Sequence, residues 1–369
     1  MIRGLQKRVA AGHACNPFLN LLVAGVFALA LIACNTRDRA QPSLLEAPWS
    51  FDADAEELRE ASCPAGTVFK AATRVQLNAS PVSLTDIDKE RDLPGATFVG
   101  GWHLRSPASD FGGLSGLALD SDDNLLAISD RGTFVWIELA RGAPAAAGMA
   151  RMRGADGAIL SGLRQRDAEG LDLRDGTALV SFEHAHRILA FDLSRCGAAA
   201  HGMEVSRLGN RIAGMRTAIK PNAGAEGLVL TAEGGLLLAI ETPGPGLPMA
   251  RVGRSGAASV AGWIERRGEP VLTGLDRVGD TFYALLRSYS PGSGNTIEVL
   301  AFAVPPAPGL IEVKRILRLE PRHGTDNFEG IALQRLESGG LRLWMVSDDN
   351  FSSRQRTLLY VFDLAVSAE

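Results

Sequence analysis

The sequence predicts an all-β fold, a β-propeller with five clear four-stranded repeats. The best-defined repeat spans Asp326 to Leu364, where three short apolar runs alternate with Gly- and Asp-rich turns. Such runs, rich in β-branched and aromatic residues, indicate antiparallel strands. The same order recurs four times upstream, and the repeats share one glycine, at positions 116, 170, 227, 274 and 330. This period of 47 to 57 residues is typical of propeller blades with long loops.

The order of parts within a repeat predicts where its polar residues gather. If the first two strands are antiparallel neighbours, the start of the first and the end of the second lie at one end of the sheet. The residues before each glycine should then meet the residues that end each second strand at one mouth of a central channel. The two sets are Ser115, Glu169, Glu226, Thr273 and Glu329, and Asp130, Glu183, Glu241, Arg287, Asp348 and Asp349. Most are carboxylates, which repel unless cations or arginines compensate them.

Residues 1–33 are predicted to be an export signal, residues 34–65 a lipidated tether and residues 66–369 the propeller domain. The first eight residues hold three basic side chains, and residues 18–33 form an apolar run too short to cross a bilayer comfortably. The tether contains an acidic run, Asp52 to Glu60, which fits either a disordered spacer or one short helix.

The sequence Leu31-Ile32-Ala33-Cys34 resembles the lipobox of bacterial lipoproteins. That resemblance implies cleavage before Cys34 and a diacylglycerol on its thiol; an ordinary secretory signal or a membrane anchor is the alternative. Asn35 stands where an Asp would resemble an inner-membrane retention signal. An exported lipoprotein anchored in the outer membrane and facing the periplasm is therefore expected.

Charge narrows the class of partner. The chain has 38 basic and 42 acidic residues, and removal of the three basic residues of the signal leaves 35 against 42, a net charge of −7. This balance argues against nucleic acid. The expected partner is a small-molecule substrate or ligand, with membrane contact through the lipid anchor only and the protein a monomer.

Two cysteines remain once Cys15 leaves with the signal and Cys34 is lipidated. Cys63 and Cys196 then lie in an exported chain, where disulfides are allowed. A disulfide between them is the simplest interpretation, and two separate thiols are the alternative. No spacing of Cys and His residues indicates a metal site.

The sequence near the two ends of the predicted domain indicates how the ring closes. The last repeat stops after its third strand, Thr357 to Leu364, and the segment Gly95 to Leu104 has the pattern of a strand that could complete it. Val68 to Leu77 is a strand candidate for a degenerate sixth blade. The Ala-rich residues 143–150 are expected to be a surface connection, and Pro243 to Pro248 a loop.

Short motifs distinguish the repeats: Gly113-Leu114-Ser115-Gly116-Leu117, Ser129-Asp130-Arg131-Gly132, Ala168-Glu169-Gly170, Phe182-Glu183-His184, Ala225-Glu226-Gly227, Asp326-Asn327-Phe328-Glu329-Gly330 and Ser347-Asp348-Asp349-Asn350-Phe351. Over roughly residues 95–364 they resemble the phytase-like propeller family described as "esterase-like activity of phytase". The resemblance implies a secreted propeller with metal-dependent phosphoester hydrolysis. The fourth repeat departs from it, because Thr273 and Arg287 stand where other repeats carry acids.

The acids suggest a divalent cation, with Ca²⁺ first, because hard cations take six to eight oxygen ligands. The candidate ligands are Asp130, Glu169, Glu183, Glu226, Glu241, Glu329, Asp348 and Asp349. Such an ion would neutralise a phosphate and activate water. Arg131 and Arg287 could clamp the phosphate oxygens, and His184 or His186 could move a proton. Alternatively, the Glu side chains bond backbone amides of neighbouring blades and only hold the ring together.

Three functions stay open. The first is a metal-dependent hydrolase of phosphate esters, and the second is a lactonase-like propeller hydrolase with one divalent ion. The third is a propeller that binds a ligand or protein at the cell envelope without catalysis. A serine esterase is disfavoured, because the sequence has no G-x-S-x-G motif.

Overall fold

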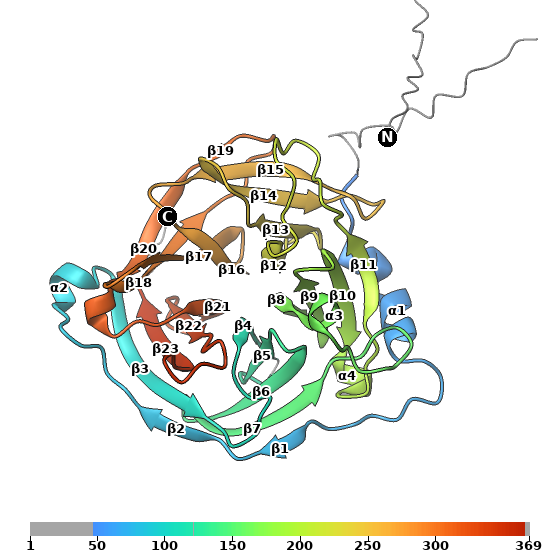
Figure 1. Ribbon diagram of the computed structural model, residues 1–369, viewed down its shortest axis with the longest axis horizontal. Coiled ribbons are helices and arrows are strands. Elements are labelled where there is room, and N and C mark those ends of the chain that lie inside the picture. Colours follow the sequence, from blue (N-terminus) through green and yellow to red (C-terminus); the bar gives the residue numbers. More distant parts are fainter. Residues whose placement is uncertain (1–46, 121, 366–369) are drawn as a thin grey trace, which may run out of the picture. The chain divides into compact units, whose positions relative to one another are not determined.

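The computed structural model describes residues 47–120 and 122–365, and the strands of this part form five sheets. Figure 1 shows the sheets arranged radially around a common centre. The innermost strands are β4, β8, β12, β16 and β21, and each contacts the next in ring order, with β21 against β4. The described part is therefore a five-bladed β-propeller, as the repeats predict. The predicted export signal and Cys34 lie outside the described residues.

The first four blades follow the chain from the centre outward. The first contains β4 (Leu114–Leu119), β5 (Leu125–Ser129), β6 (Thr133–Ala140) and β7 (Ala143–Arg151), with β1 (Thr73–Val75) at its outer edge. The second contains β8 (Ala168–Arg174), β9 (Thr177–Phe182), β10 (Arg187–Asp192) and β11 (Met203–Arg207). The third contains β12 (Ala225–Leu230), β13 (Leu236–Ile240), β14 (Gly246–Val252), β15 (Ala258–Glu265) and β19 (Leu310–Ile311). The fourth contains β16 (Val271–Val278), β17 (Thr281–Ser290), β18 (Gly294–Phe302) and β20 (Val313–Leu319).

The last blade combines strands from both ends of the domain. It contains β21 (Phe328–Arg335), β22 (Leu341–Ser347) and β23 (Leu358–Leu364), followed outward by β3 (Ala96–Arg105) and β2 (Asn78–Pro81). Strand β3 runs antiparallel to β23, with His103 opposite Leu358 and Ala96 opposite Leu364. Short helices lie between strands: α2 (Lys89–Asp92), α3 (Leu163–Arg166), α4 (Leu193–Cys196) and the 3₁₀ helix η1 (Pro321–His323).

Three expectations about strands need correction. The segment 68–77, the candidate for a degenerate sixth blade, instead supplies β1 to the edge of the first blade, where Thr73 pairs with Met149. The Ala-rich segment expected to be a connection forms β7, because β6 offers it a full ladder of backbone partners. The expected loop Pro243 to Pro248 already enters β14 at Gly246.

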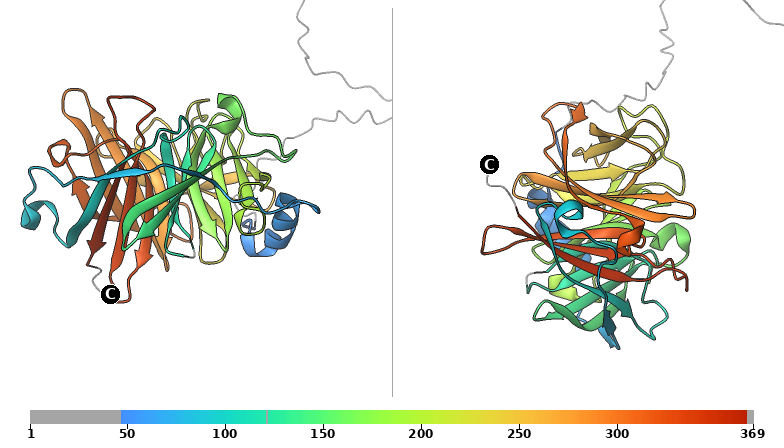
Figure 2. Two further views of the ribbon diagram at one scale, coloured as in Figure 1. Left: turned by 90° about the horizontal axis from the view of Figure 1, so that it is seen from below. Right: turned by 90° about the vertical axis from the view of Figure 1, so that its left-hand side faces the viewer.

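Residues 47–65 pack on the propeller, which corrects their assignment to a tether. Helix α1 (Phe51–Ser62) lies outside the second blade in Figures 1 and 2. Trp49 and Phe51 are buried in the core between the second and third blades, and Cys63 at the end of α1 forms a disulfide with Cys196. Within the described residues, no helix is both long and apolar enough to cross a membrane.

The repeated glycine is required by the close approach of the inner strands. A Cβ atom on Gly170 would lie 2.9 Å from the backbone nitrogen of Leu228 in the next blade. The same atom on Gly227 would lie 2.9 Å from the nitrogen of Leu275, and on Gly274 2.6 Å from the carbonyl oxygen of Glu329. Only about 10 Å³ of space remains among these strands, less than a chain of waters needs. The axis is therefore closed at the level of these glycines, and the expected channel does not pass through the ring.

Candidate functional site

Every inner strand has a β-bulge at the position before its glycine. The pairing register with the second strand shifts there in all five blades. A bulge leaves one residue outside the ladder and redirects its side chain, and bulges are frequent beside active sites. The residues left out of the pairing are Ser115, Glu226, Thr273 and Glu329 and, in the second blade, Glu169 together with Gly170.

A repeated hydrogen bond brings the second set of predicted residues to the same end. In four blades, an acid directly follows the second strand, and its backbone N–H donates a hydrogen bond of 2.9 Å. The acceptor is the backbone carbonyl of the residue three positions before the repeated glycine of the same blade. The pairs are Asp130 with Gly113, Glu183 with Asp167, Glu241 with Gly224, and Asp348 with Asn327. We call the resulting cluster the acidic mouth; it consists of Asp130, Asp167, Glu169, Glu183, Glu226, Glu241, Glu329 and Asp348.

The bulge residues divide into two kinds. Ser115 donates its hydroxyl to the carbonyl of Ala168 at 2.5 Å, and Thr273 donates to that of Phe328 at 3.2 Å, so both join neighbouring blades. Glu226 accepts a hydrogen bond of 3.2 Å from the amide of Gly224, in its own blade. Within the described residues, Glu169 has no hydrogen-bond partner. Glu169 and Glu226 therefore do not bond backbone amides of neighbouring blades as the structural alternative requires, whereas Glu329 accepts from the guanidinium of Arg287 in the fourth blade at 3.4 Å.

Burial and mutual repulsion raise the pKa of these carboxyls. Burial raises the pKa of Glu169 well above its usual range, and the charges of Glu226 and Glu329 add to the effect. Glu226 is shifted in the same direction by burial and then by Glu241 and Glu183. Charged carboxylates here lack compensating positive charge, which is the electrostatic condition for binding a cation.

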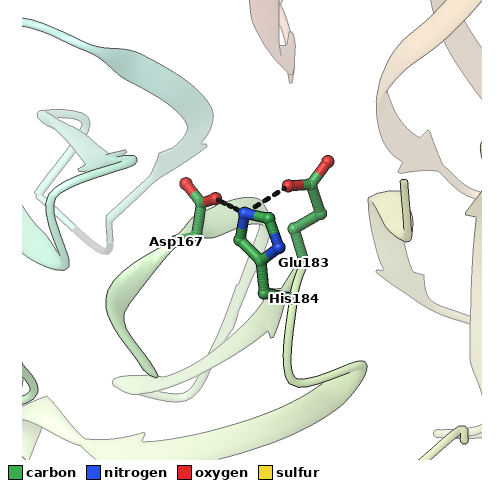
Figure 3. Close-up of side chains that lie close together, drawn as sticks. All are labelled: Asp167, Glu183 and His184. Atoms are coloured by element: carbon green, nitrogen blue, oxygen red, sulfur yellow. Dashed lines mark ion pairs between the residues drawn. The ribbon is translucent and has the colours of Figure 1, made fainter. Parts of the chain in front are cut away.

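His184 stands between two carboxylates (Figure 3). Its Nε2 atom lies 3.1 Å from an oxygen of Asp167 and 3.3 Å from one of Glu183. The three side chains are 11% to 18% exposed, so solvent screens them only partly. Burial and a hydrogen bond with Asp167 contribute to raising the pKa of Glu183 to about 8, together with the charge of that neighbour. The carboxyl of Glu183 can therefore hold a proton near neutral pH.

A second group contains only oxygen ligands and shares Glu183 with the first. Ligand atoms of Glu183, Glu226 and Glu241 all lie within 4.8 Å of one another, as do those of Asp167, Glu183 and His184. Three carboxylates from the second and third blades thus converge on one small volume. This donor set suits a hard cation such as Ca²⁺ or Mg²⁺.

The fifth and fourth blades close the other side of the mouth. Arg287 lies 3.4 Å from Glu329, and Asn327 donates to Glu329 at 2.9 Å and to Asp348 at 3.3 Å. Burial raises the pKa of Glu329 to about 7 despite Arg287, and raises that of Asp348 to about 8. Within the described residues, Arg287 is the one arginine that forms an ion pair with a member of the acidic mouth.

Asp130, Asp349 and Arg131 stand apart from the two ligand groups. Burial raises the pKa of Asp130 to about 6. Asp349 accepts bonds from the amides of Gly113 and Phe351 and from a threonine hydroxyl, so its oxygens hold two loops together. The guanidinium of Arg131 lies 3.2 Å from the ring centre of Phe351 and donates to a backbone carbonyl.

The sequence interpretation missed Asp167 and Arg166. Asp167 precedes Glu169 by two residues, and only Asn327 in the fifth repeat is a polar counterpart. That partial repetition is the signal that could have found it. Burial raises the pKa of Asp167, and the charge of Arg166 is one of the effects that oppose this rise. The buried Nε atom of Arg166 has no hydrogen-bond partner within the described residues. His186, the other proton carrier considered, is buried, with its Nδ1 atom also unpartnered there.

A family model with the description "Phytase-like: Esterase-like activity of phytase" matches residues 109–351. The chain belongs to this family. The match includes all members of the acidic mouth, so the family's defining region and the candidate site coincide. The description names an esterase-like activity, and no curated protein matches the chain.

Solved structures resemble the chain at the level of the fold alone. Glutaminyl cyclase from Myxococcus xanthus is 16% identical, with a TM-score of 0.42 over 81% of this chain and 100% of that one. The PQQ-bound aldose sugar dehydrogenase of Streptomyces coelicolor is 13% identical, with a TM-score of 0.39 over 73% and 99%. The PQQ domain of pyranose dehydrogenase from Coprinopsis cinerea is 10% identical, with a TM-score of 0.41 over 81% and 99%.

Proposed function

We propose that this protein is a metal-dependent hydrolase of phosphate esters whose site is the acidic mouth. The observation that carries the proposal is the pair of ligand groups around Glu183, one of oxygen atoms only and one that includes His184. Eight carboxyl groups there meet one ion-paired arginine, Arg287, and two further arginines, Arg131 and Arg166, whose charges act on Asp130. Acids still outnumber arginines, so charge balance favours a bound cation over an empty structural rim.

The two groups suggest different tasks. Glu183, Glu226 and Glu241 would hold a divalent ion, with Ca²⁺ first among the candidates because all the ligands are carboxylates. When bound, such an ion would neutralise phosphate charge and lower the pKa of a water molecule. His184, held between Asp167 and Glu183, would accept and return the proton.

Two arginines fit a phosphate. Arg166 and Arg287 each have a buried Nε atom without a hydrogen-bond partner within the described residues. Buried donors are seldom left unpaired, and a phosphate oxygen would satisfy such a donor. Arg287 is one of the two arginines predicted to bind phosphate oxygens. The other, Arg131, instead contacts the ring of Phe351 and donates to a backbone carbonyl. Arg166 is the better second candidate.

The test is an assay of metal-free protein on nitrophenyl phosphate, bis-nitrophenyl phosphate and a simple lactone, each with Ca²⁺, Mg²⁺ or Mn²⁺. We expect added metal to restore hydrolysis of a phosphate ester. The rate should be lower in Glu183→Gln than in the wild type by at least about a hundredfold. The control Asp276→Asn, at the opposite end of the propeller, should retain it. Lactone hydrolysis alone would support the lactonase-like alternative. Metal binding without hydrolysis of any substrate would leave a ligand-binding role and contradict the enzymatic proposal.

We also propose that the protein is a monomeric lipoprotein, attached through Cys34 to the outer membrane and facing the periplasm, with a small molecule and no nucleic acid as its partner. The basic start, the apolar run and Leu31-Ile32-Ala33-Cys34 support the anchor. Mass spectrometry of the mature N-terminus should find acylated Cys34. An unmodified N-terminus at another residue would contradict the proposal.

Ring closure between the ends of the domain is a further part of the proposal. The pairing of β3 with β23 supports it, because without β3 the strand β23 would become an exposed edge. Deletion of residues 95–104 should therefore cause aggregation. A deletion variant that stays monomeric with unchanged melting would contradict this role.

A further inference from the structure

A second cavity lies at the end of the propeller opposite the acidic mouth, between the third and fourth blades. Its volume is about 570 Å³, which is within the range of small-molecule sites. Two turns border it, one between β12 and β13 at Thr231 to Gly235 and one between β16 and β17 at Gly279 and Asp280. The segment Pro48 to Ser50 covers part of it. The cavity is therefore separate from the proposed hydrolytic site.

One wall of this cavity is apolar. Pro48, Ala303, Val304, Pro306 and Pro308 line it with exposed or half-buried side chains, and the buried Trp49 and Phe282 also border it. Surfaces of this kind bind the hydrocarbon or aromatic part of a ligand. The indole of Trp49 is held there by the N-terminal segment, whose backbone N–H at Trp49 donates to the carbonyl of Val252 at 2.9 Å.

Two half-buried arginines supply positive charge to the same cavity. Arg251, on β14, donates to the carbonyl of Pro305 at 3.1 Å, and Arg277, on β16, donates to the carbonyls of Leu230 and Gly279. Neither arginine forms an ion pair with a carboxylate within the described residues. Carbonyl acceptors fix the direction of a guanidinium but leave its charge uncompensated, so an anion gains from binding beside it.

The acids near this cavity compensate Arg277 more than Arg251. Glu233 and Asp280 are exposed at the tips of the bordering turns. The pKa of Glu233 is lowered first by hydrogen bonds to its own backbone and to Thr231, and only then by Arg277 and Arg251. Arg277 also faces the buried Asp172 and Asp276. Arg251 therefore has the least compensated charge.

We infer that this cavity binds an organic anion with an apolar body, such as a fatty acid or an alkyl phosphate. The apolar wall would take the body, and Arg251, supported by Arg277, would take the carboxylate or phosphate group. This inference is independent of the proposed hydrolysis, because no residue of the acidic mouth lines the cavity.

Fluorescence titration of the full chain tests the inference with two matched probes. Anilinonaphthalene sulfonate has an apolar body and one negative charge, and phenylnaphthylamine has nearly the same body without the charge. We expect the sulfonate to bind at least about tenfold more tightly than the neutral probe, as one charge-assisted hydrogen bond in a half-buried site allows. Dodecanoate and dodecyl phosphate should displace it, and dodecanol should not; their relative potency identifies the preferred headgroup.

Three variants locate the binding. Arg251→Met should weaken the sulfonate about tenfold or more and leave the neutral probe unchanged, while Arg254→Met, an exposed arginine outside the lining, should change neither. Ala232→Trp, at the exposed rim, should block both probes without disturbing the core. Equal affinity of the two probes, an unchanged sulfonate affinity in Arg251→Met, or unchanged binding in Ala232→Trp would overturn the inference.

Discussion

The two ends of the propeller axis both contain buried carboxyl groups, but Glu169 and Glu226 of the acidic mouth have far fewer hydrogen-bond donors than the aspartates at the opposite end. At the end opposite the acidic mouth, Asp172 accepts hydrogen bonds from the amides of Leu173 and Leu230, and Asp276 accepts from those of Arg277 and Leu333. Each aspartate thereby ties its own blade to the next one. In the acidic mouth, Glu169 has no hydrogen-bond donor within the described residues, and Glu226 has a single amide.

The difference separates structural carboxylates from carboxylates that can bind a ligand. An acid whose oxygens are occupied by backbone amides has little capacity left for an ion. An acid that is held by a bulge, close to other acids and without donors, destabilises the folded protein in its charged form unless a cation is bound. The same side-chain chemistry thus holds blades together at one end and forms a candidate metal site at the other.

The largest expected effect is the pH dependence of stability in metal-free protein. The pKa is raised to about 8 for Glu183 and Asp348 and to about 7 for Glu329 and Asp276, above the values of unfolded chains. The folded state therefore binds more protons, and the free energy of unfolding should fall as pH rises from about 5 to about 8. Urea unfolding with chelator across this range measures it.

Saturating metal should flatten that pH profile, because an ion favours the deprotonated acids of the mouth. The contribution of Asp276 lies at the opposite end and should persist with metal, disappearing only in Asp276→Asn. A metal-free protein whose stability increases with pH over this range would contradict the account.

The next largest effect concerns the structural end. Asp276→Ala removes the acceptor of two backbone amides, those of Arg277 and Leu333. Leaving two donors without partners should lower the free energy of unfolding by about 2–4 kcal/mol. Asp276→Asn keeps one acceptor oxygen, so its free energy of unfolding should fall by less than that of Asp276→Ala. Equal stability of the alanine variant and the wild type would show that these hydrogen bonds contribute little.

Removing a carboxylate from the acidic mouth should stabilise the metal-free protein, whereas Asp276→Ala should destabilise it. In metal-free protein at pH 8, Glu169→Gln and Glu226→Gln should each raise the free energy of unfolding by about 1–3 kcal/mol, because folding no longer brings together repelling acids. The same variants should lose stabilisation by added metal. If both variants are destabilised without metal, the carboxylates have a structural role after all.

The smallest effect is expected for Glu329→Gln. Glu329 repels its acidic neighbours but also pairs with Arg287 at 3.4 Å and accepts from Asn327. Loss of repulsion and loss of the ion pair should nearly cancel, leaving a change within about 1 kcal/mol. Thermal melting of Glu329→Gln beside Glu169→Gln tests whether the arginine makes this difference, and equal stabilisation of both would contradict it.

Repetition determined what could be predicted from the sequence. The five glycines mark the blades because a Cβ atom at those positions would meet the next inner strand, and this requirement recurs in every repeat. The acids beside the glycines were found for the same reason. Asp167 and Arg166 were missed because they occur in one repeat only. The role of Asp349 depends on Gly113, which is 236 residues away in the sequence, and no local pattern reveals such a contact.

The outer parts of the blades were harder to predict for a different reason. Strand β7 is rich in alanine and glycine, which have low β propensity, and it forms because β6 presents a ladder of backbone partners. Helix α1 belongs to the domain because Trp49 and Phe51 anchor the segment in the core. Two buried aromatic residues in an otherwise acidic stretch give little periodicity from which packing could be inferred.

Calorimetric titration of metal-free protein with Ca²⁺, and then with Mn²⁺, tests the central claim that the acidic mouth is a cation site. Wild type and Asp276→Asn should bind with the same stoichiometry and affinity, whereas Glu183→Gln, which removes a ligand shared by both groups, should lose at least about tenfold in affinity. Absence of heat with either ion in the wild type, or unchanged binding in Glu183→Gln, would contradict the account.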